Sequence, residues 1–337
     1  MTDLLAYDFM QRALLAALMV GLVAPLVGVF LVQRKLSLIG DGLGHTALAG
    51  VAVGLVLNTS PVWAALVAAV AAAVVIELIR ASGRTQGDVA LAVIFYGGIA
   101  GGVVIISKSA QGTPANLTAY LFGAITTVRS GDLAVFAVLG VLVLVTTWLL
   151  RPRLFAVASD EEYARAMGMP VLALNIALAV LTAVTVVVSM RIVGLLLISA
   201  LMIVPNAAAQ LLGTSFRSTM RWAAVIGVVC AVSGVVVSYE ADTPSGGTIV
   251  VLAIGVFVLV SIGRSVGTRV RARRHARAEL HPHEHGRDCG HPAVPHEGHV
   301  DYLHDGHRHA PHEGHYDEHA LAAAAREAAE RKEMGRS

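Results

Sequence analysis

The feature that most constrains this fold is a series of long apolar segments. They fall at about 9–32, 42–57, 61–80, 88–107, 131–150, 170–190, 192–212, 222–239 and 247–263. A transmembrane α-helix needs roughly 20 predominantly apolar residues. The sequence therefore predicts an all-α, multi-pass membrane protein with nine candidate spans. Because the second window is short, and only Arg191 separates the sixth from the seventh, we expect eight or nine full crossings.

The charged residues and histidines divide the chain into two parts. Only 14% of the 337 residues are charged, whereas soluble domains carry roughly 25%. Residues 1–263 contain 13 Lys/Arg, 11 Asp/Glu and a single histidine, while residues 264–337 contain 12, 12 and 13. We therefore predict a membrane domain over 1–263 and a basic, histidine-rich tail over 264–337.

The positions of the basic residues predict the orientation in the membrane. Basic side chains recur in alternate loops, beginning with Arg34 and Lys35. Cytoplasmic loops carry an excess of Lys and Arg. Nine spans would then place the N-terminus outside the cell and the tail in the cytoplasm.

One pair of ionisable residues lies in apolar surroundings. Asp41 and His45 are four residues apart at the start of the second window, so on a helix they share a face. Carboxylate and imidazole are ligands for zinc and for manganese. Two ligands are too few for a permanent structural site, which favours an ion in transit, and two copies of the chain could supply four. The alternative is a helix cap at Asp41 and an interior histidine at His45.

Two connections carry further polar candidates. Residues 157–169 include a predicted short helix from Asp160 to Met167, which either docks on a cytoplasmic partner or is a solvated connector. On the opposite side, Glu240 and Asp242 either attract cations to an entrance or are solvated turn residues. Glu77 and Arg80 are predicted to form a local ion pair. The chain contains no GxxxxGK[ST] phosphate loop.

Five segments together carry a family resemblance. They are SLIGDGLGHTALAGVAVG at 37–54, LTAYLFGAI at 117–125, DEEYARAMGM at 160–169, VGLLLISALMIVPNAAAQLL at 193–212 and DTPSGGTIV at 242–250. In this order they resemble the permease subunit of the metal-uptake ABC transporters, which import zinc, manganese or iron in bacteria. The resemblance covers about residues 8–263. The long charged tail departs from the family pattern.

The resemblance implies specific roles for some of these residues. Asp41 and His45 match the family's Asp and His, which are implied to coordinate the transported ion. The segment at 160–168 matches the coupling helix, with Glu162, Ala164 and Gly168 at the positions that fit an ATPase groove. The implied partners are a second copy of the chain, a pair of cytoplasmic ATP-binding subunits and an extracellular or periplasmic metal-binding protein. The implied location is the bacterial cell (inner) membrane.

The tail is predicted to bind metal. It contains few apolar residues, so we expect it to be disordered in the absence of metal. Imidazoles interleaved with acids predict several sites of moderate affinity for zinc or nickel, against the alternative of a solvated tail with incidental affinity. The histidines concerned are His281, His283, His285, His296, His299, His304, His307, His309, His312 and His315.

These observations lead to one functional prediction. We expect a non-enzymatic permease that moves Zn²⁺ inward by alternating access, with no tightly bound cofactor, while separate subunits hydrolyse ATP. The tail histidines favour zinc because manganese prefers oxygen ligands. Manganese or iron import by the same machinery is the alternative, and a zinc-responsive membrane sensor or channel is the alternative from another class. We expect no nucleic-acid partner.

Overall fold

The computed structural model describes residues 6–83, 87–107, 120–124, 130–190, 192–195, 197–279, 289–296, 299–304, 307–312 and 315–319. The chain divides into two compact units, Met1–Ile262 and Gly263–Ser337. The first unit is helical, whereas the strands of the described chain all belong to the second.

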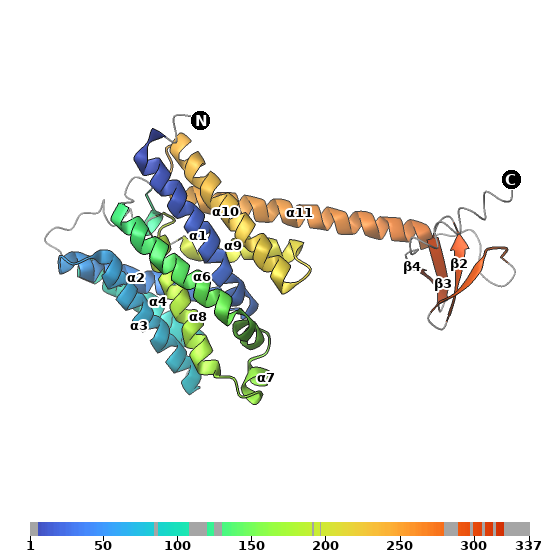
Figure 1. Cartoon of the computed structure of the whole chain (residues 1–337), viewed down its shortest axis with the longest axis horizontal. Helices are drawn as coiled ribbons and strands as arrows, with labels where there is room; N and C mark the ends of the chain where they lie inside the picture. The colour runs from blue at the N-terminus through green and yellow to red at the C-terminus, as the bar shows by residue number, and fades with distance from the viewer. Residues whose placement is uncertain are drawn as a thin grey trace. The chain divides into compact units, whose positions relative to one another are not determined.

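The described helices follow the apolar windows closely (Figure 1). They are α1 (Asp8–Gln33), α2 (Ile39–Val56), α3 (Pro61–Ser82), α4 (Gly87–Ser107), α6 (Ser130–Ser159), α7 (Glu161–Ala166), α8 (Val171–Ser189), α9 (Ile198–Leu212), α10 (Phe216–Glu240) and α11 (Ser245–Glu279). Within the described residues, eight of them are long and apolar enough to cross a membrane, and α9 is a shorter apolar helix. The predicted all-α, multi-pass fold is confirmed.

Local sequence explains where several helices begin and end. Pro61 opens α3, and Gly83 ends it with a left-handed backbone, which glycine adopts at little cost. Ser215 and Ser218 form a reciprocal capping box at the start of α10. In α8, the hydroxyls of Thr182 and Thr185 donate to carbonyl oxygens one turn earlier, at 2.8 and 2.7 Å. These bonds satisfy polar groups that would otherwise be costly in an apolar interior.

The first unit has central and peripheral helices. α8 packs against α1, α2, α3 and α6, while α1 also packs against α9 and α10. In the most apolar stretch of α8, 72% of the residues are buried, compared with 17% in α4 and in α11. The uncovered apolar side chains of the peripheral helices suit a lipid environment, because the protein itself does not bury them.

Two irregular segments pack backbone to backbone beside the start of α11. The amide of Leu195 donates to the carbonyl oxygen of Tyr120 at 2.9 Å, and the hydroxyl of Ser245 donates to the carbonyl oxygen of Ile192 at 2.7 Å. Gly123 and Gly194 have positive φ angles of 76° and 84°, and a Cβ on either would meet backbone of the opposite segment. Three of the motifs quoted above therefore meet at one place.

The second unit contains a sheet that we did not predict. Strands β1 (Ala293–His296), β2 (His299–His304), β3 (His307–His312) and β4 (His315–His319) form an antiparallel sheet in the order β1-β2-β3-β4. The expectation that the tail as a whole is disordered in the absence of metal stays a prediction. Along the sequence, Glu-Gly, Asp-Gly and again Glu-Gly separate consecutive strands, and Asp-Gly between two strands is a strong hairpin signal.

Candidate functional site

The first polar cluster of the membrane unit lies at the start of α2. Asp41 and His45 are separated by one helical turn and are both half-buried. The shared face that we predicted from their spacing follows from the helical backbone. Asp41 is not the N-cap, since Leu38 occupies that position and makes no side-chain cap. The alternative of a simple capping aspartate is therefore excluded.

Side chains from α9 and α4 surround this pair. The hydroxyl of Ser199, on α9, donates to Oδ1 of Asp41, and Ser199 is the sole hydrogen-bond partner of that carboxylate among the described side chains. The ring of Phe95 meets the imidazole of His45 edge-on at 4.4 Å. Within the described residues, no hydrogen bond reaches the His45 imidazole. Both groups therefore keep most of their capacity to bind a ligand.

Small residues bring the backbones around the pair together. A Cβ on Gly98 of α4 would lie 2.8 Å from the carbonyl carbon of His45, and a Cβ on Gly44 would lie 2.8 Å from the carbonyl oxygen of Leu195. The glycines at 98 and 44 thus hold α4 and the irregular 192–195 segment directly against α2. Backbone as well as side chains therefore packs close to the pair, which remains half-buried.

A cleft of about 1150 Å³ opens beside the start of α2. Residues from α2, α3, α4, α7 and α8 line it, including Ile39, Leu91 and Asn175. Leu91 lies against Gly42, because a Cβ added there would be 2.6 Å from its Cδ1. The cleft therefore ends within about one helical turn of Asp41, on the side that carries the basic loops.

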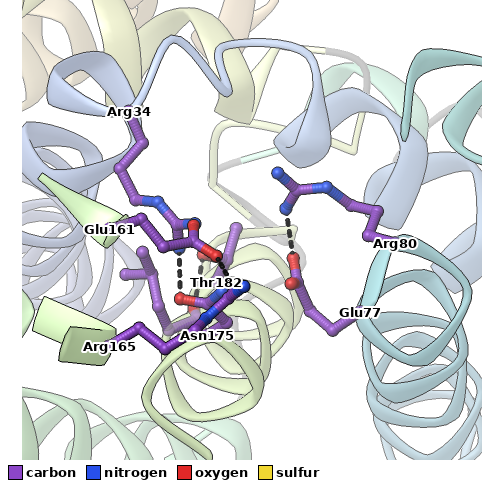
Figure 2. A network of polar contacts seen from close by, with 8 residues as sticks. Arg34, Glu77, Arg80, Glu161, Arg165, Asn175 and Thr182 are labelled. Atoms are coloured by element: carbon purple, nitrogen blue, oxygen red, sulfur yellow. Dashed lines mark hydrogen bonds and ion pairs between the residues drawn. The ribbon is translucent and has the colours of Figure 1, made fainter. Parts of the chain in front are cut away.

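The second polar cluster lies at this cleft (Figure 2). Arg34, just after α1, donates to Oδ1 of Asn175 on α8 at 2.6 Å and to Oε2 of Glu161 on α7 at 2.7 Å. The Arg34 side chain is only 7% exposed. Burial lowers the pKa of the Arg34 guanidinium below its ordinary value, and the Glu161 carboxylate opposes that shift. Arginine remains protonated in proteins, so one buried cation links three helices.

The predicted pair of Glu77 and Arg80 lies across the same cleft (Figure 2). The two side chains form an ion pair at 2.7 Å, and Glu77 is 3% exposed. The prediction of a local ion pair is confirmed. A charge at such burial is normally paired, and Arg80 supplies that partner.

The short helix predicted at 160–167 is confirmed as α7. The carboxylate of Asp160 caps it by accepting from the amide of Tyr163 at 2.8 Å, and Gly168 follows it with a positive φ. Glu162 and Gly168 are exposed. Ala164 is 1% exposed, so this third predicted docking residue packs into the permease core and lies outside the exposed surface of α7.

The structure describes the remaining predicted residues unevenly. Glu240 and Asp242 are exposed beside the turn between α10 and α11, which fits either an entrance or a solvated turn. His281, His283 and His285 lie outside the described residues. For most of the other predicted tail histidines, the structure describes the backbone register.

Sequence reasoning missed Ser199, Arg34 and Asn175 as members of these clusters. Ser199 lies 158 residues from Asp41 along the chain, and Arg34 lies 141 residues from Asn175. One sequence signal was available, because a polar residue inside a long apolar run, such as Asn175 or Ser199, usually has a partner. Identifying that partner requires the tertiary fold.

Comparison with known proteins identifies the family of the membrane unit. The model of the ABC 3 transport family matches residues 6–264. The manganese transport system membrane protein MntC of Halalkalibacterium halodurans is 32% identical over 257 residues, which cover 76% of this chain and 88% of MntC. The manganese import system permease protein ScaB of Streptococcus parasanguinis is 32% identical over 270 residues, covering 80% of this chain and 95% of ScaB.

A solved structure shares the fold of the membrane unit. PsaBC from Streptococcus pneumoniae in complex with Fab superposes with a TM-score of 0.70 and 32% sequence identity. The match covers 77% of this chain and 93% of that chain. It therefore accounts for the helical unit.

Proposed function

This chain belongs to the ABC 3 transport family and is a metal ABC transporter permease, and we propose that it moves Zn²⁺ inward along a path lined by Asp41 and His45. As a permease it is a transport component rather than an enzyme. The observation that carries the proposal is the chemistry of the α2 pair. A carboxylate and an imidazole share one helix face, and the described protein uses little of their bonding capacity.

Incomplete coordination suits transport. A closed structural zinc site takes four protein ligands, whereas one chain offers two at this position. A carrier must bind its ion firmly enough to replace water and weakly enough to release it. Ser199 supports the ligand function by donating to Asp41, since ligating carboxylates are commonly held by hydrogen bonds.

The cleft supplies a route away from the pair. It ends beside Ile39 and Leu91 and is lined by charged groups nearer the basic loops. In this proposal, an ion released from Asp41 passes Ile39 and Leu91 into an open space lined by both apolar and charged side chains. Because the cleft is on the side with the basic loops, we assign release to the cytoplasm, which makes the transport inward.

We assign the remaining ligands to a second copy of the chain. Two copies meeting near α2 would supply two carboxylates and two imidazoles. Closed two-fold symmetry is the commonest arrangement of homo-oligomers. An extracellular or periplasmic metal-binding protein would deliver the ion, and a pair of cytoplasmic ATP-binding subunits would drive the cycle of alternating access.

The Arg34 cluster suits the transmission of movement from those ATP-binding subunits. Glu162 on α7 and Gly168 just after it are exposed at the surface, and Glu161 of α7 holds Arg34. Arg34 in turn binds α8 through Asn175, and α8 packs against α2. A displacement of α7 by a partner would therefore be passed through Arg34 and α8 to α2, the helix that carries Asp41 and His45.

The identity of the ion has two candidates. Zinc is supported by the histidine-rich tail, because imidazole suits zinc better than manganese. Manganese is supported by the names of MntC and ScaB. The Asp41 and His45 donor set accommodates either ion.

Uptake by the assembled importer tests the proposal. The full chain is reconstituted into vesicles with its ATP-binding subunits and binding protein, and ATP-dependent accumulation of radiolabelled zinc and of manganese is measured separately. We expect zinc to accumulate, and the Asp41→Ala, His45→Ala double variant to accumulate neither ion. Strong manganese uptake with no zinc uptake would show that the transported ion is manganese and not zinc.

A matched control separates loss of ligands from loss of structure. Thr46→Val changes a neighbouring α2 residue whose hydroxyl donates to the carbonyl oxygen of Gly42 at 2.9 Å. This variant should transport normally. Normal uptake by the Asp41→Ala, His45→Ala protein would show that the path lies elsewhere.

A further inference from the structure

The amide of Asn206 joins two membrane helices at a place where both contain proline. Asn206 lies on α9 and is 0% exposed. Its Nδ2 donates to the carbonyl oxygen of Pro25 on α1 at 2.8 Å and to that of Met202 at 2.7 Å. Pro25 lies inside α1, and Pro205 lies inside α9. Since proline cannot donate a backbone hydrogen bond, each helix lacks one internal bond here, and the Asn206 side chain links the two helices.

Close packing fixes α1 at the same level. A Cβ on Gly28 would lie 2.0 Å from the carbonyl oxygen of Met202, so α1 and α9 meet through their backbones. A Cβ on Gly227 of α10 would lie 2.4 Å from the carbonyl oxygen of Gly21 and 2.4 Å from Cγ of Pro25. The interrupted part of α1 is therefore held by α10 as well, and it gives α9 a fixed support.

The same face of α9 contacts the helix that carries Asp41 and His45. Ser199, Met202 and Asn206 are three and four residues apart, so they share one face of α9. Ser199 donates to Asp41 of α2. A Cβ on Gly40 of α2 would lie 3.3 Å from Cβ of Ser199 and 3.7 Å from Sδ of Met202. This face of α9 thus meets α2 at its first turn and α1 further along.

Few other features fix the first turns of α9. The helix has only 15 residues, and its N-cap is Leu197, whose side chain cannot accept a hydrogen bond. The bond from Asn206 to Pro25 therefore sets the rotation of α9 against α1. Ser199 lies on the same rigid helix, about 10 Å along its axis, so its direction follows from that rotation.

An amide is a costly side chain at this position. Within the described residues, Oδ1 of Asn206 is buried and has no hydrogen-bond partner. An unpaired buried acceptor destabilises a protein, whereas an apolar residue of similar shape avoids that cost. Buried asparagine between helices is used to fix their register at the expense of stability. The amide therefore suits the placement of α9 better than it suits stability alone.

We propose that Asn206 is a positioning residue for the transported ion, because it fixes α9 so that Ser199 donates to Asp41. Asn206 itself does not touch the ion. Its bond to α1 sets the rotation of α9, Ser199 then orients the carboxylate of Asp41, and the carboxylate binds the metal. This inference rests on the proposed function of Asp41 as a metal ligand.

Uptake kinetics of the reconstituted importer test this role. Asn206→Leu keeps the side-chain volume and removes both hydrogen bonds, so the zinc concentration for half-maximal uptake should rise by about tenfold, while the maximal rate changes little. Ser199→Ala should cause the same rise, and the double variant should be no weaker than either, because both changes remove one interaction. Effects that multiply in the double variant would overturn the proposal. Gln210→Leu replaces an exposed amide on the same helix and should change nothing.

Disulfide formation reports the position of α9 independently of transport. Gly40→Cys with Ser199→Cys, in a chain whose two native cysteines are replaced, brings together Cβ positions that lie 3.3 Å apart, close to the distance of about 3.5–4.5 Å in disulfides. Oxidation in membranes should cross-link this chain. Adding Asn206→Leu should largely abolish the cross-link, and adding Gln210→Leu should preserve it. An unchanged cross-link with Asn206→Leu would overturn the proposal.

A second variant and one comparison complete the test. Gly28→Ala leaves Asn206 in place but forces α9 away from α1, so it should weaken the cross-link and raise the half-maximal concentration in the same way. Normal uptake by Asp41→Ala would overturn the proposed function and this inference together. If Asp41→Ala lost uptake while Asn206→Leu kept the parent values in both assays, this inference alone would fail.

Discussion

The two polar clusters of the membrane unit differ in how far the protein itself satisfies them. Arg34 donates hydrogen bonds to both Asn175 and Glu161. Asp41 binds one side chain, Ser199, and His45 makes a ring contact with Phe95. A satisfied cluster stabilises one arrangement of helices, whereas ligand groups with spare capacity suit a passing cation. This comparison is the basis for our proposal that Arg34 transmits movement and that Asp41 and His45 bind the ion.

The largest effect is expected at the α2 pair. If Asp41 is a direct ligand, as we propose, replacing it alone with alanine should reduce metal uptake by more than about 100-fold, beyond the usual cost of losing a supporting residue. Uptake by reconstituted vesicles measures it, with membrane abundance checked by quantitative blotting. Uptake within twofold of that of the parent protein would contradict the assignment of Asp41 as a metal ligand.

The second effect is expected at Arg34. Arg34→Gln removes the buried charge that joins α7 to α8. ATP hydrolysis should therefore continue while the amount of metal moved per ATP falls. We expect a fall of about 5- to 150-fold, the factor that corresponds to the loss of a typical coupling free energy. Parallel assays of phosphate release and metal uptake provide this ratio. If both rates fell in proportion, Arg34 would be a structural residue only.

A smaller effect is expected at Ser199. Ser199→Ala leaves both ligands in place and removes only the hydrogen bond to Asp41, so the metal concentration for half-maximal uptake should rise by about tenfold. The maximal rate should change little. A concentration series of uptake measurements distinguishes this result from the loss of rate expected at Asp41.

The smallest effect is expected at Arg165, which provides a control for Arg34. Both arginines pair with Glu161, but the Arg165 side chain is 70% exposed and its nitrogen lies 3.1 Å from the carboxylate. Exposed pairs contribute about 0–1 kcal/mol. Arg165→Gln should therefore leave the ratio of metal to ATP unchanged, and a loss equal to that of Arg34→Gln would contradict the assigned role.

The sequence predicted the features that depend on neighbouring residues. Apolar length located the spans, the four-residue spacing placed Asp41 and His45 on one face, and capping chemistry located α7. Burial of Ala164 was not predicted, because a six-residue helix has no clear apolar face. The contacts of Asp41 with Ser199 and of Arg34 with Asn175 join residues more than a hundred positions apart. Local sequence patterns therefore cannot predict them.

The tail shows a second limit of reasoning from composition. Its low apolar content led us to expect disorder, and we did not predict the four strands that the structure describes, although the Asp-Gly at 305–306 carries a hairpin signal. Composition averages over a segment, whereas a hairpin depends on a few residues at fixed spacing. The strand register pairs particular histidines, such as His304 with His307, which composition alone cannot distinguish.

Anomalous X-ray diffraction from crystals of the permease loaded with Zn²⁺ tests the central claim most directly. The account predicts a zinc peak at α2, about 2.0–2.2 Å from an Asp41 oxygen and from a His45 ring nitrogen. Zinc peaks confined to the tail, with none between those two side chains, would contradict it.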